Sequence, residues 1–280
     1  MEKKLKVISV IGTGYLGKQI IEKSLLFGHD IKAFDINKED LSSFTKSMRE
    51  KIKENKLNST ITQYGSIVDA VKDVDLVIEA VPEKLELKRE VFLEIDKVAS
   101  SHTIIATNSS SIPISKIEDV VERKDRVMNI HFYDLFRMPI ADIMRGTQTS
   151  NETFEKGRLW LESIDITPLE VKKECYGFVM NRIWRAIKKD CLKIWAGGHA
   201  DMETVDKAWK IFCQFFVESN LGPFYFMDRI GLDVVYDIEM SYFKNSGLSD
   251  DKPPDDLKEM IERGELGVKS GKGFYNYKSQ

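Results

Sequence analysis

Three glycines near the start of the chain have the spacing of a phosphate-binding turn. Gly12, Gly14 and Gly17 form a G-x-G-x-x-G pattern directly after the apolar segment 6–11. In such a pattern the first glycine permits a tight turn, the second lets the backbone approach a pyrophosphate, and the third lets a helix pack closely on a strand. The pattern therefore predicts a strand, a glycine turn and a helix that together bind a diphosphate.

The residues that follow extend this pattern. We predict a helix over 15–27, and the unpaired N–H groups at its start, those of Tyr15 and Leu16, would face the phosphates. A second strand over 31–34 ends at Asp35, close to the separation of about 20 residues at which an acid accepts hydrogen bonds from ribose hydroxyls. A carboxylate there also repels the 2′-phosphate of NADP. The segment predicts an NAD site; a glycine loop in an unrelated α/β protein is the alternative.

The four histidines differ in their surroundings. His131 lies at the end of the apolar segment 127–132, whereas His29, His102 and His199 lie in segments typical of turns. A histidine at a strand end is suited to take the hydroxyl proton when a carbinol is oxidised. A buried structural histidine is the alternative, and position alone does not separate the two.

Strands and helices alternate through the first 171 residues, which predicts a doubly wound, mostly parallel (Rossmann) sheet. Further strands are predicted at 60–64, 75–82, 103–107, 126–132, 140–144 and 166–171, and further helices at 37–55, 67–71, 83–98 and 151–163. In such sheets the ligand lies beyond the carboxyl ends of the strands. The candidate residues at those ends are Gly12, Gly14, Asp35, Glu83, the segment 108–111 and His131.

The pattern changes near residue 174. Helices are predicted at 177–195, 203–216, 223–245 and 257–263, and no strand pattern recurs. We therefore predict an NAD-binding domain over 1–173 and an all-helical substrate and dimerisation domain over 174–280. The aromatic residues within 212–226 are numerous for so small a domain, so part of this cluster is expected to face a second subunit.

The composition of the 280 residues excludes several classes of protein. Lys and Arg number 42 against 45 Asp and Glu, a net charge of -3, which predicts neither nucleic acid nor an anionic membrane as partner. No segment approaches the about 18 apolar residues of a membrane span. Cys175, Cys191 and Cys213 lack metal or disulfide spacing, and no signal peptide is recognisable. We expect a cytoplasmic protein with reduced thiols and no metal site.

Seven motifs, in order along nearly the whole chain, resemble those of the 3-hydroxyacyl-CoA dehydrogenase family. They are the glycine pattern with Asp35, IEAVPEKLELK at 78–88, TNSSS at 107–111, NIHFY at 129–133, GFVMNR at 177–182, LGPF at 221–224 and GKGFY at 271–275. Each is weak alone, but their shared order is specific. The resemblance implies an NAD-dependent enzyme that oxidises an (S)-3-hydroxyacyl-CoA to the 3-oxoacyl-CoA, and the reverse. From the aromatic cluster within 212–226 we also expect a homodimer.

The resemblance also implies roles for the matching residues. His131 matches the catalytic histidine, Ser110 the serine that hydrogen-bonds the reacting oxygen, and Asn181 the asparagine near substrate and nicotinamide. Glu83 and Lys88 match residues that contact the nicotinamide ribose. Without the resemblance, a turn cap would be the simpler role for Ser110 and a solvated helix position for Asn181. The candidate NAD-binding set is Gly12, Gly14, Tyr15, Leu16, Gly17, Asp35, Glu83, Lys88 and Asn108.

The acid that pairs with the family's histidine is replaced in this chain. The resemblance implies a glutamate at this position. Asp142 aligns with it if the loop before it is one residue shorter in this chain than in the family. Asp134, which replaces an asparagine of the family, is the rival acid. We predict Asp142, because a buried acid on the strand 140–144 needs a partner and His131 is available. Its side chain is one methylene shorter than glutamate.

Two further departures concern the substrate. The segment 36–74 is shorter than the helical hairpin with which the family covers the CoA nucleotide. Arg137 stands where the family has an apolar or small residue, and a guanidinium near His131 would bind a carboxylate or phosphate. A surface arginine paired with Asp134 is the alternative. A free 3-hydroxy acid of carnitine or gulonate type therefore remains an alternative substrate, and a non-catalytic NAD-binding relative a further alternative.

Overall fold

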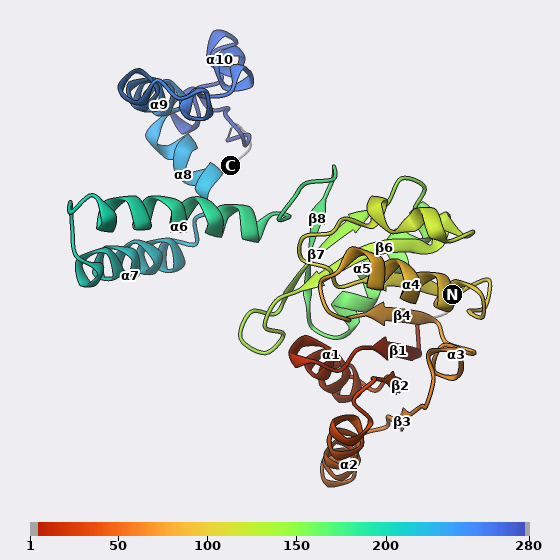
Figure 1. The fold of residues 1–280 in the computed structure, drawn as a ribbon. Helices are drawn as coiled ribbons and strands as arrows, with labels where there is room; N and C mark the ends of the chain where they lie inside the picture. The colour runs from red at the N-terminus through yellow and green to blue at the C-terminus, as the bar shows by residue number, and fades with distance from the viewer. Residues whose placement is uncertain (1–4, 278–280) are drawn as a thin grey trace. The chain divides into compact units, whose positions relative to one another are not determined.

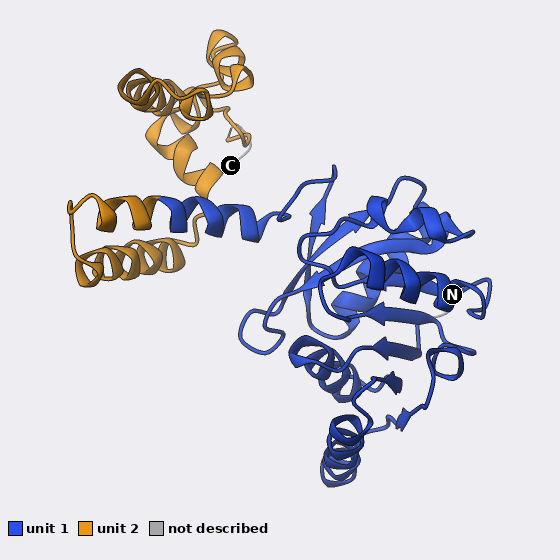
Figure 2. Ribbon diagram, in the orientation of Figure 1, with its two compact units in different colours: residues 1–189 blue, residues 190–280 orange. Residues whose placement is uncertain are grey.

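The computed structural model describes residues 5–277 and divides the chain into two compact units, 1–189 and 190–280 (Figure 2). The division comes inside one helix, α6 (Met180–Ala196). The secondary structure changes earlier, since the last strand ends at Val171. A domain boundary after residue 173 therefore stays a prediction.

An eight-stranded sheet forms the centre of the first unit (Figure 1). Its strands are β1 (Val7–Ile11), β2 (Asp30–Phe34), β3 (Ile61–Gln63), β4 (Leu76–Glu79), β5 (Ile104–Thr107), β6 (Val127–Phe132), β7 (Ile140–Arg145) and β8 (Thr167–Val171). The order is β3-β2-β1-β4-β5-β6-β7-β8, and only the β6–β7 pair is antiparallel. The predicted doubly wound, mostly parallel sheet is confirmed.

Helices cover both faces of this sheet, because alternate residues of each strand point to opposite sides. The helices are α1 (Tyr15–Leu26), α2 (Lys38–Glu54), α3 (Ile67–Ala70), α4 (Leu85–Asp96) and α5 (Asn151–Ser163), with 3-10 turns η1 (Ile114–Lys116), η2 (Glu118–Val120) and η3 (Lys124–Arg126). Val10 and Ile78 pack in one core with residues of α1 and α5, and Ile11 and Val77 pack in a second core with residues of α3 and α4. Both strands β4 and β5 are fully buried.

The glycine turn shows why two of its three glycines, Gly12 and Gly17, carry no side chain. Gly12 has φ +97°, and a Cβ there would lie 2.6 Å from the carbonyl oxygen of Ala80, the residue directly after the neighbouring strand β4. A Cβ on Gly17 would lie 2.1 Å from the Gly12 carbonyl oxygen. A Cβ on Gly14 would meet nothing within 4 Å. The first and third glycines are therefore required by packing, and the second leaves open space above the start of α1.

The described residues of the second unit form helices, turns and two isolated antiparallel bridges, Gly267 with Lys272 and Lys272 with Asn276. The helices are α7 (Met202–Ser219), α8 (Pro223–Ile230), α9 (Leu232–Ser246) and α10 (Asp255–Glu262), with 3-10 turns η4 (Ser249–Asp251) and η5 (Val268–Ser270). The prediction of one helix over 223–245 is wrong. Gly231, at φ +105°, separates α8 from α9, because no right-handed helix can pass through that backbone conformation.

The GKGFY motif of the second unit has a structural explanation. Asp228 is fully buried and accepts hydrogen bonds from the N–H groups of Phe274 and Tyr275, each at 3.0 Å, and from the Tyr277 hydroxyl at 2.8 Å. A Cβ on Gly273 would lie 2.1 Å from the Asp228 carboxylate. The motif therefore wraps backbone closely around one buried acid.

The glycine geometry yields a matched pair of substitutions. Gly17→Ala is expected to lower the free energy of unfolding by about 2–3 kcal/mol, because its methyl group overlaps backbone that cannot move independently. Gly14→Ala is expected to change it by less than about 1 kcal/mol. Urea unfolding of both variants measures the difference, and equal losses would show that the close approach at Gly17 does not constrain the fold.

Candidate functional site

A groove of about 740 Å³ lies at the carboxyl ends of β1, β2 and β4. It is lined by Ile11, Gly12, Gly14, Phe34, Asp35, Ile36, Gly65, Ser66, Ile67, Ala80, Val81, Pro82, Leu87, Glu90, Val91 and Glu94. The strands β1 to β3 follow one another towards one edge of the sheet, and β4 to β8 towards the other. Open α/β sheets bind their ligands at this switch in strand order, between β1 and β4. The structure therefore brings Gly12, Gly14 and Asp35 to one groove.

This groove fits a dinucleotide. The Asp35 carboxylate is fixed by Thr13, whose N–H and hydroxyl donate to Oδ2 at 2.5 and 3.0 Å, and by the Asn37 N–H, which donates to Oδ1 at 2.8 Å. The first N–H groups of α1, including those of Tyr15 and Leu16, have no acceptor within the helix. The open space at Gly14 gives a diphosphate access to these N–H groups.

His131 and Asp142 face each other across the antiparallel pair of β6 and β7, where they are directly opposite in register. His131 Nδ1 lies 3.4 Å from Asp142 Oδ2, and both side chains are buried. The Tyr133 hydroxyl donates to the same carboxylate oxygen at 2.5 Å, and the phenol ring packs edge-on against the imidazole. Phe178 stacks on the imidazole with ring centroids 5.1 Å apart and planes 11° from parallel.

Asp134, the rival acid, lies elsewhere. It accepts hydrogen bonds from the N–H groups of Phe136 and Arg137 at 3.2 and 3.0 Å, and from the Tyr15 hydroxyl at 3.0 Å. The hydrogen bond from the Arg137 N–H contributes most to holding the pKa of Asp134 below its usual value. Asp134 therefore folds the loop between β6 and β7 and connects it to the start of α1, while Asp142 lies beside His131.

Glu83 and Lys88 belong to a network at the end of β4. Lys88 is 1% exposed, and its Nζ lies 2.8 Å from Glu79 Oε1 and 3.3 Å from Glu83 Oε2. The second oxygen of Glu79 accepts from the Thr107 hydroxyl at 2.6 Å. In this arrangement Lys88 lies beneath Glu83, so Glu83 is the member of the predicted pair that is open to a ligand.

The three serines of the TNSSS motif divide into two roles. The hydroxyls of Ser109 and Ser111 donate to Glu83 Oε1 at 2.5 and 2.7 Å. Ser110 between them is exposed, and none of residues 5–277 hydrogen-bonds its hydroxyl. Ser110 is therefore the serine that is free to meet a substrate.

The remaining candidates are placed around His131. Asn108 Oδ1 accepts from the Phe132 N–H at 2.9 Å, which fixes the end of β6 beside His131. Asn181, at the start of α6, is half-buried, and its backbone N–H contacts the Tyr133 hydroxyl. Arg137 is exposed on the loop that Asp134 folds.

Three residues that build the site, Glu79, Tyr133 and Phe178, were not predicted from the sequence, although all lie inside the seven motifs. A charged residue in an apolar strand signals a buried partner, and Glu79 gave this signal. Tyr133 gave none, because its contact with Asp142 depends on strand register. Phe178 stacks on His131 from a left-handed backbone conformation, φ +52°, which a phenylalanine rarely adopts. No sequence pattern predicts this conformation.

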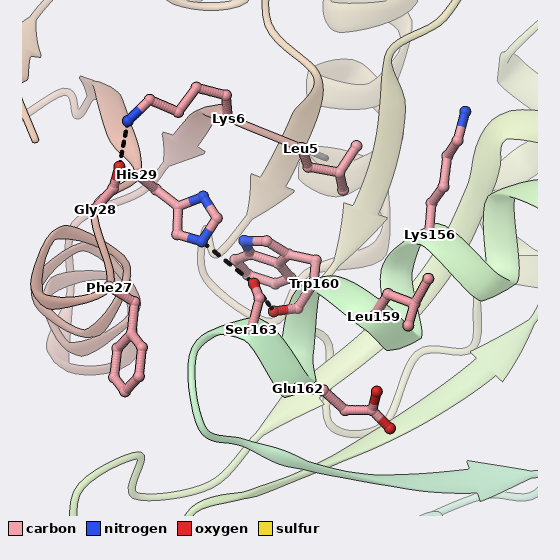
Figure 3. A pocket seen from close by; sticks show the side chains of 10 residues that line it. All are labelled: Leu5, Lys6, Phe27, Gly28, His29, Lys156, Leu159, Trp160, Glu162 and Ser163. Carbon is pink, nitrogen blue, oxygen red and sulfur yellow. Dashed lines mark hydrogen bonds between the residues drawn. The ribbon is translucent and has the colours of Figure 1, made fainter. Parts of the chain in front are cut away.

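A second hollow, of about 620 Å³, lies at the amino ends of the strands (Figure 3). Its lining includes Lys6 before β1, His29 before β2, and Trp160 and Ser163 of α5. His29 Nε2 lies 3.3 Å from the Ser163 hydroxyl, and burial, together with the charge of Lys6, lowers the pKa of His29. Because the glycine turn and His131 lie at the carboxyl ends, this hollow is separate from the candidate site.

The described residues offer neither a metal cluster nor a membrane-spanning helix. Within residues 5–277, no three His, Cys, Asp or Glu side chains gather closely enough to hold a metal ion. No helix in the described part of the chain is long and apolar enough to cross a membrane.

The Glu83 network makes a pH-dependent contribution to stability. Burial alone would raise the pKa of Glu83, but hydrogen bonds from Ser109 and Ser111 and the charge of Lys88 lower it from 4.5 to about 2. Because the pKa of Glu83 is lower in the folded than in the unfolded state, its ionisation stabilises the folded state at any pH above about 4.5. This stabilisation is lost as the pH falls from 4.5 towards 2. Urea unfolding at pH 6 and pH 3.5 is expected to show a smaller loss on acidification for Glu83→Gln than for the native chain. Identical losses would contradict the network.

Comparison with known proteins finds two family models that match successive parts of the chain. A family model described as "3-hydroxyacyl-CoA dehydrogenase, NAD binding domain" matches residues 7–175, and the "3-hydroxyacyl-CoA dehydrogenase, C-terminal domain" model matches residues 177–277. A 3-hydroxybutyryl-CoA dehydrogenase of Clostridioides difficile is 31% identical over 283 residues, which cover 96% of this chain and 99% of that protein.

Solved structures agree. The 3-hydroxyacyl-CoA dehydrogenase of Archaeoglobus fulgidus has a TM-score of 0.80 at 26% identity, covering 97% of this chain and 92% of that chain. The NAD-dependent dismutase 5-formyl-3-hydroxy-2-methylpyridine 4-carboxylic acid 5-dehydrogenase has a TM-score of 0.75 at 27% identity, covering 98% and 92%. The chain therefore belongs to the 3-hydroxyacyl-CoA dehydrogenase family of oxidoreductases, and its first domain is the NAD-binding domain of that family.

Proposed function

We propose that this chain oxidises a 3-hydroxyacyl-CoA to the 3-oxoacyl-CoA, and catalyses the reverse reaction, with His131 as the general base. The observation that carries the proposal is the buried contact of His131 Nδ1 with Asp142 at the carboxyl ends of the strands. With Nδ1–H directed at the carboxylate, Nε2 keeps the lone pair that takes the hydroxyl proton. NAD, when bound, accepts the hydride from C3.

Other residues of the chain support the same step. The free Ser110 hydroxyl and the Asn181 amide are suited to hold the reacting oxygen while charge develops on it. Glu83, fixed by Ser109 and Ser111, is suited to bind the nicotinamide ribose, with Lys88 holding Glu83 from beneath. The relatives named as 3-hydroxybutyryl-CoA and 3-hydroxyacyl-CoA dehydrogenases favour a CoA thioester as substrate.

A free 3-hydroxy acid is the second candidate substrate. It is favoured by the exposed Arg137 on the loop after β6 and by the short segment between β2 and β4, which holds the 17-residue α2 and only the four-residue α3 as a further helix. A structural relative at 27% identity is named for a carboxylic acid without CoA. A non-catalytic NAD-binding role is disfavoured, because such a protein has no use for a buried His131–Asp142 contact beside a free serine.

NADH oxidation by purified protein tests these alternatives. We expect turnover with acetoacetyl-CoA, and we expect His131→Ala to turn over about 10²- to 10⁴-fold more slowly while its affinity for NADH is retained. Turnover only with free 3-oxo acids, lost in Arg137→Ala, would instead establish the second candidate. No turnover with any 3-oxo compound would contradict enzymatic function.

We further propose that the protein is a homodimer. Neither α6 nor α7 buries a single residue, although both carry large apolar side chains, among them Trp184, Trp195, Trp209, Phe212 and Phe215. Exposed apolar surface of this extent marks an interface, and a second copy of the chain is the partner that is always present.

Sedimentation equilibrium is expected to give twice the mass of the chain, and Phe212→Glu is expected to shift the equilibrium to monomers, because it places a charge on the apolar face. Lys207→Glu on the same helix is the control and is expected to leave the dimer intact. A monomeric native protein would contradict the proposal.

A cytoplasmic location is also proposed, supported by the three cysteines, which are all free thiols in the structure.

A further inference from the structure

Three hydrogen-bond donors share one buried carboxylate beside the candidate base. Asp142 Oδ2 faces both His131 Nδ1, at 3.4 Å, and the Tyr133 hydroxyl, at 2.5 Å. Oδ1 faces the Val179 N–H at 3.4 Å. Asp142 is fully buried, and within residues 5–277 no lysine or arginine forms an ion pair with it. Its charge therefore depends on these donors.

The two contacts of Oδ2 are unequal. The phenol makes a short hydrogen bond, whereas the imidazole lies at the outer limit of hydrogen-bonding distance. The backbone register fixes the Cα atoms of His131 and Asp142 opposite each other, so it is the short aspartate side chain that leaves this gap. A carboxylate with two rotatable bonds needs a second anchor if it is to keep one oxygen on Nδ1.

Tyr133 is placed to be that anchor. It follows His131 by two residues, so both side chains leave the same side of the sheet, and their ring centroids are 4.6 Å apart. Its phenol remains protonated and can always donate, because burial and the neighbouring Asp142 raise the pKa of Tyr133. The Asn181 N–H faces the phenol oxygen in turn.

We propose that Tyr133 is a positioning residue for catalysis: its hydroxyl binds Asp142 Oδ2 and holds the carboxylate where it orients His131 Nδ1–H. This proposal rests on the proposed role of His131 as general base. The hydroxyl does not touch the substrate and transfers no proton. The hydrogen bond fixes the short Asp142 side chain, whereas a longer acid would reach His131 Nδ1 by its own length.

Tyr133→Phe removes the hydroxyl and keeps the ring against His131. We expect kcat with acetoacetyl-CoA to fall about tenfold, with KM and the affinity for NADH unchanged, because only the orientation of the base is disturbed. Tyr277→Phe is the matched control, since it removes a tyrosine–aspartate hydrogen bond of the same kind, to the buried Asp228 of the second unit. The control is expected to keep kcat.

A rescue variant separates positioning from packing. In Tyr133→Phe/Asp142→Glu the added methylene occupies the volume that the hydroxyl leaves and carries the carboxylate towards His131, so kcat is expected to recover. Asp142→Glu alone is expected to be slow, because the hydroxyl and the longer acid compete for the same space. Native kcat in Tyr133→Phe, or a failure of the double variant to exceed the single one, would overturn the proposal.

One readout does not depend on turnover. The imidazole Nδ1–H proton of His131, assigned by its loss in His131→Ala, is expected to move in the proton NMR spectrum of Tyr133→Phe and to stay in place in Tyr277→Phe. If His131→Ala kept full activity, the proposed function would fail, while this resonance would still report whether Tyr133 positions the carboxylate. An unmoved resonance would overturn the inference by itself.

Discussion

A buried carboxylate without a cationic partner is the constraint on which the candidate site depends. Asp142 lies in the middle of β7, fully buried, and a charge in such a place is stable only if donors surround it. His131, Tyr133 and the Val179 N–H are those donors. They come from the neighbouring strand, from the residue just after that strand, and from the segment that precedes α6. One acid therefore fixes the relative positions of three parts of the first unit.

The sheet explains why the cofactor groove and this acid occur at the same edge. The parallel strands β1, β4 and β5 end at the glycine turn, at the Glu79–Lys88 network and at Asn108. The Asn108 side chain then binds the Phe132 N–H and aligns the end of β6 with its neighbours. Because β7 is antiparallel to β6, it begins beside the end of β6 after a short loop. Asp142 of β7 therefore lies opposite His131, near the end of β6.

Much of this was predictable from the sequence because it depends on local pattern. Apolar strands, their polar ends and the glycine spacing identified the sheet and the NAD groove, and the two cores formed as the alternation of each strand requires. The break at Gly231 was not predicted, since an isolated glycine is tolerated in many helices and only its positive φ ends this one.

The unpredicted parts of the site depend on tertiary contacts. Lys88 matches a family residue that contacts cofactor, yet its burial between Glu79 and Glu83 follows from how β4 and α4 pack, which spacing does not reveal. The Tyr133 hydroxyl and the strained Phe178 are likewise set by strand register and by a turn. The sequence favours Asp142 over Asp134 as the partner of His131, but their positions follow from tertiary contacts. The strand register places Asp142 opposite His131, and Asp134 accepts a hydrogen bond from the Tyr15 hydroxyl instead.

The most direct test of this account is a single-turnover measurement of NADH oxidation by acetoacetyl-CoA in Asp142→Asn, an isosteric change that removes the charge and replaces one acceptor oxygen with an NH₂ donor. If the carboxylate orients His131, the chemical step is expected to slow by about 10²- to 10⁴-fold with NADH affinity unchanged. A native rate in this variant would show that His131 acts without Asp142 and would contradict the central role assigned to the pair.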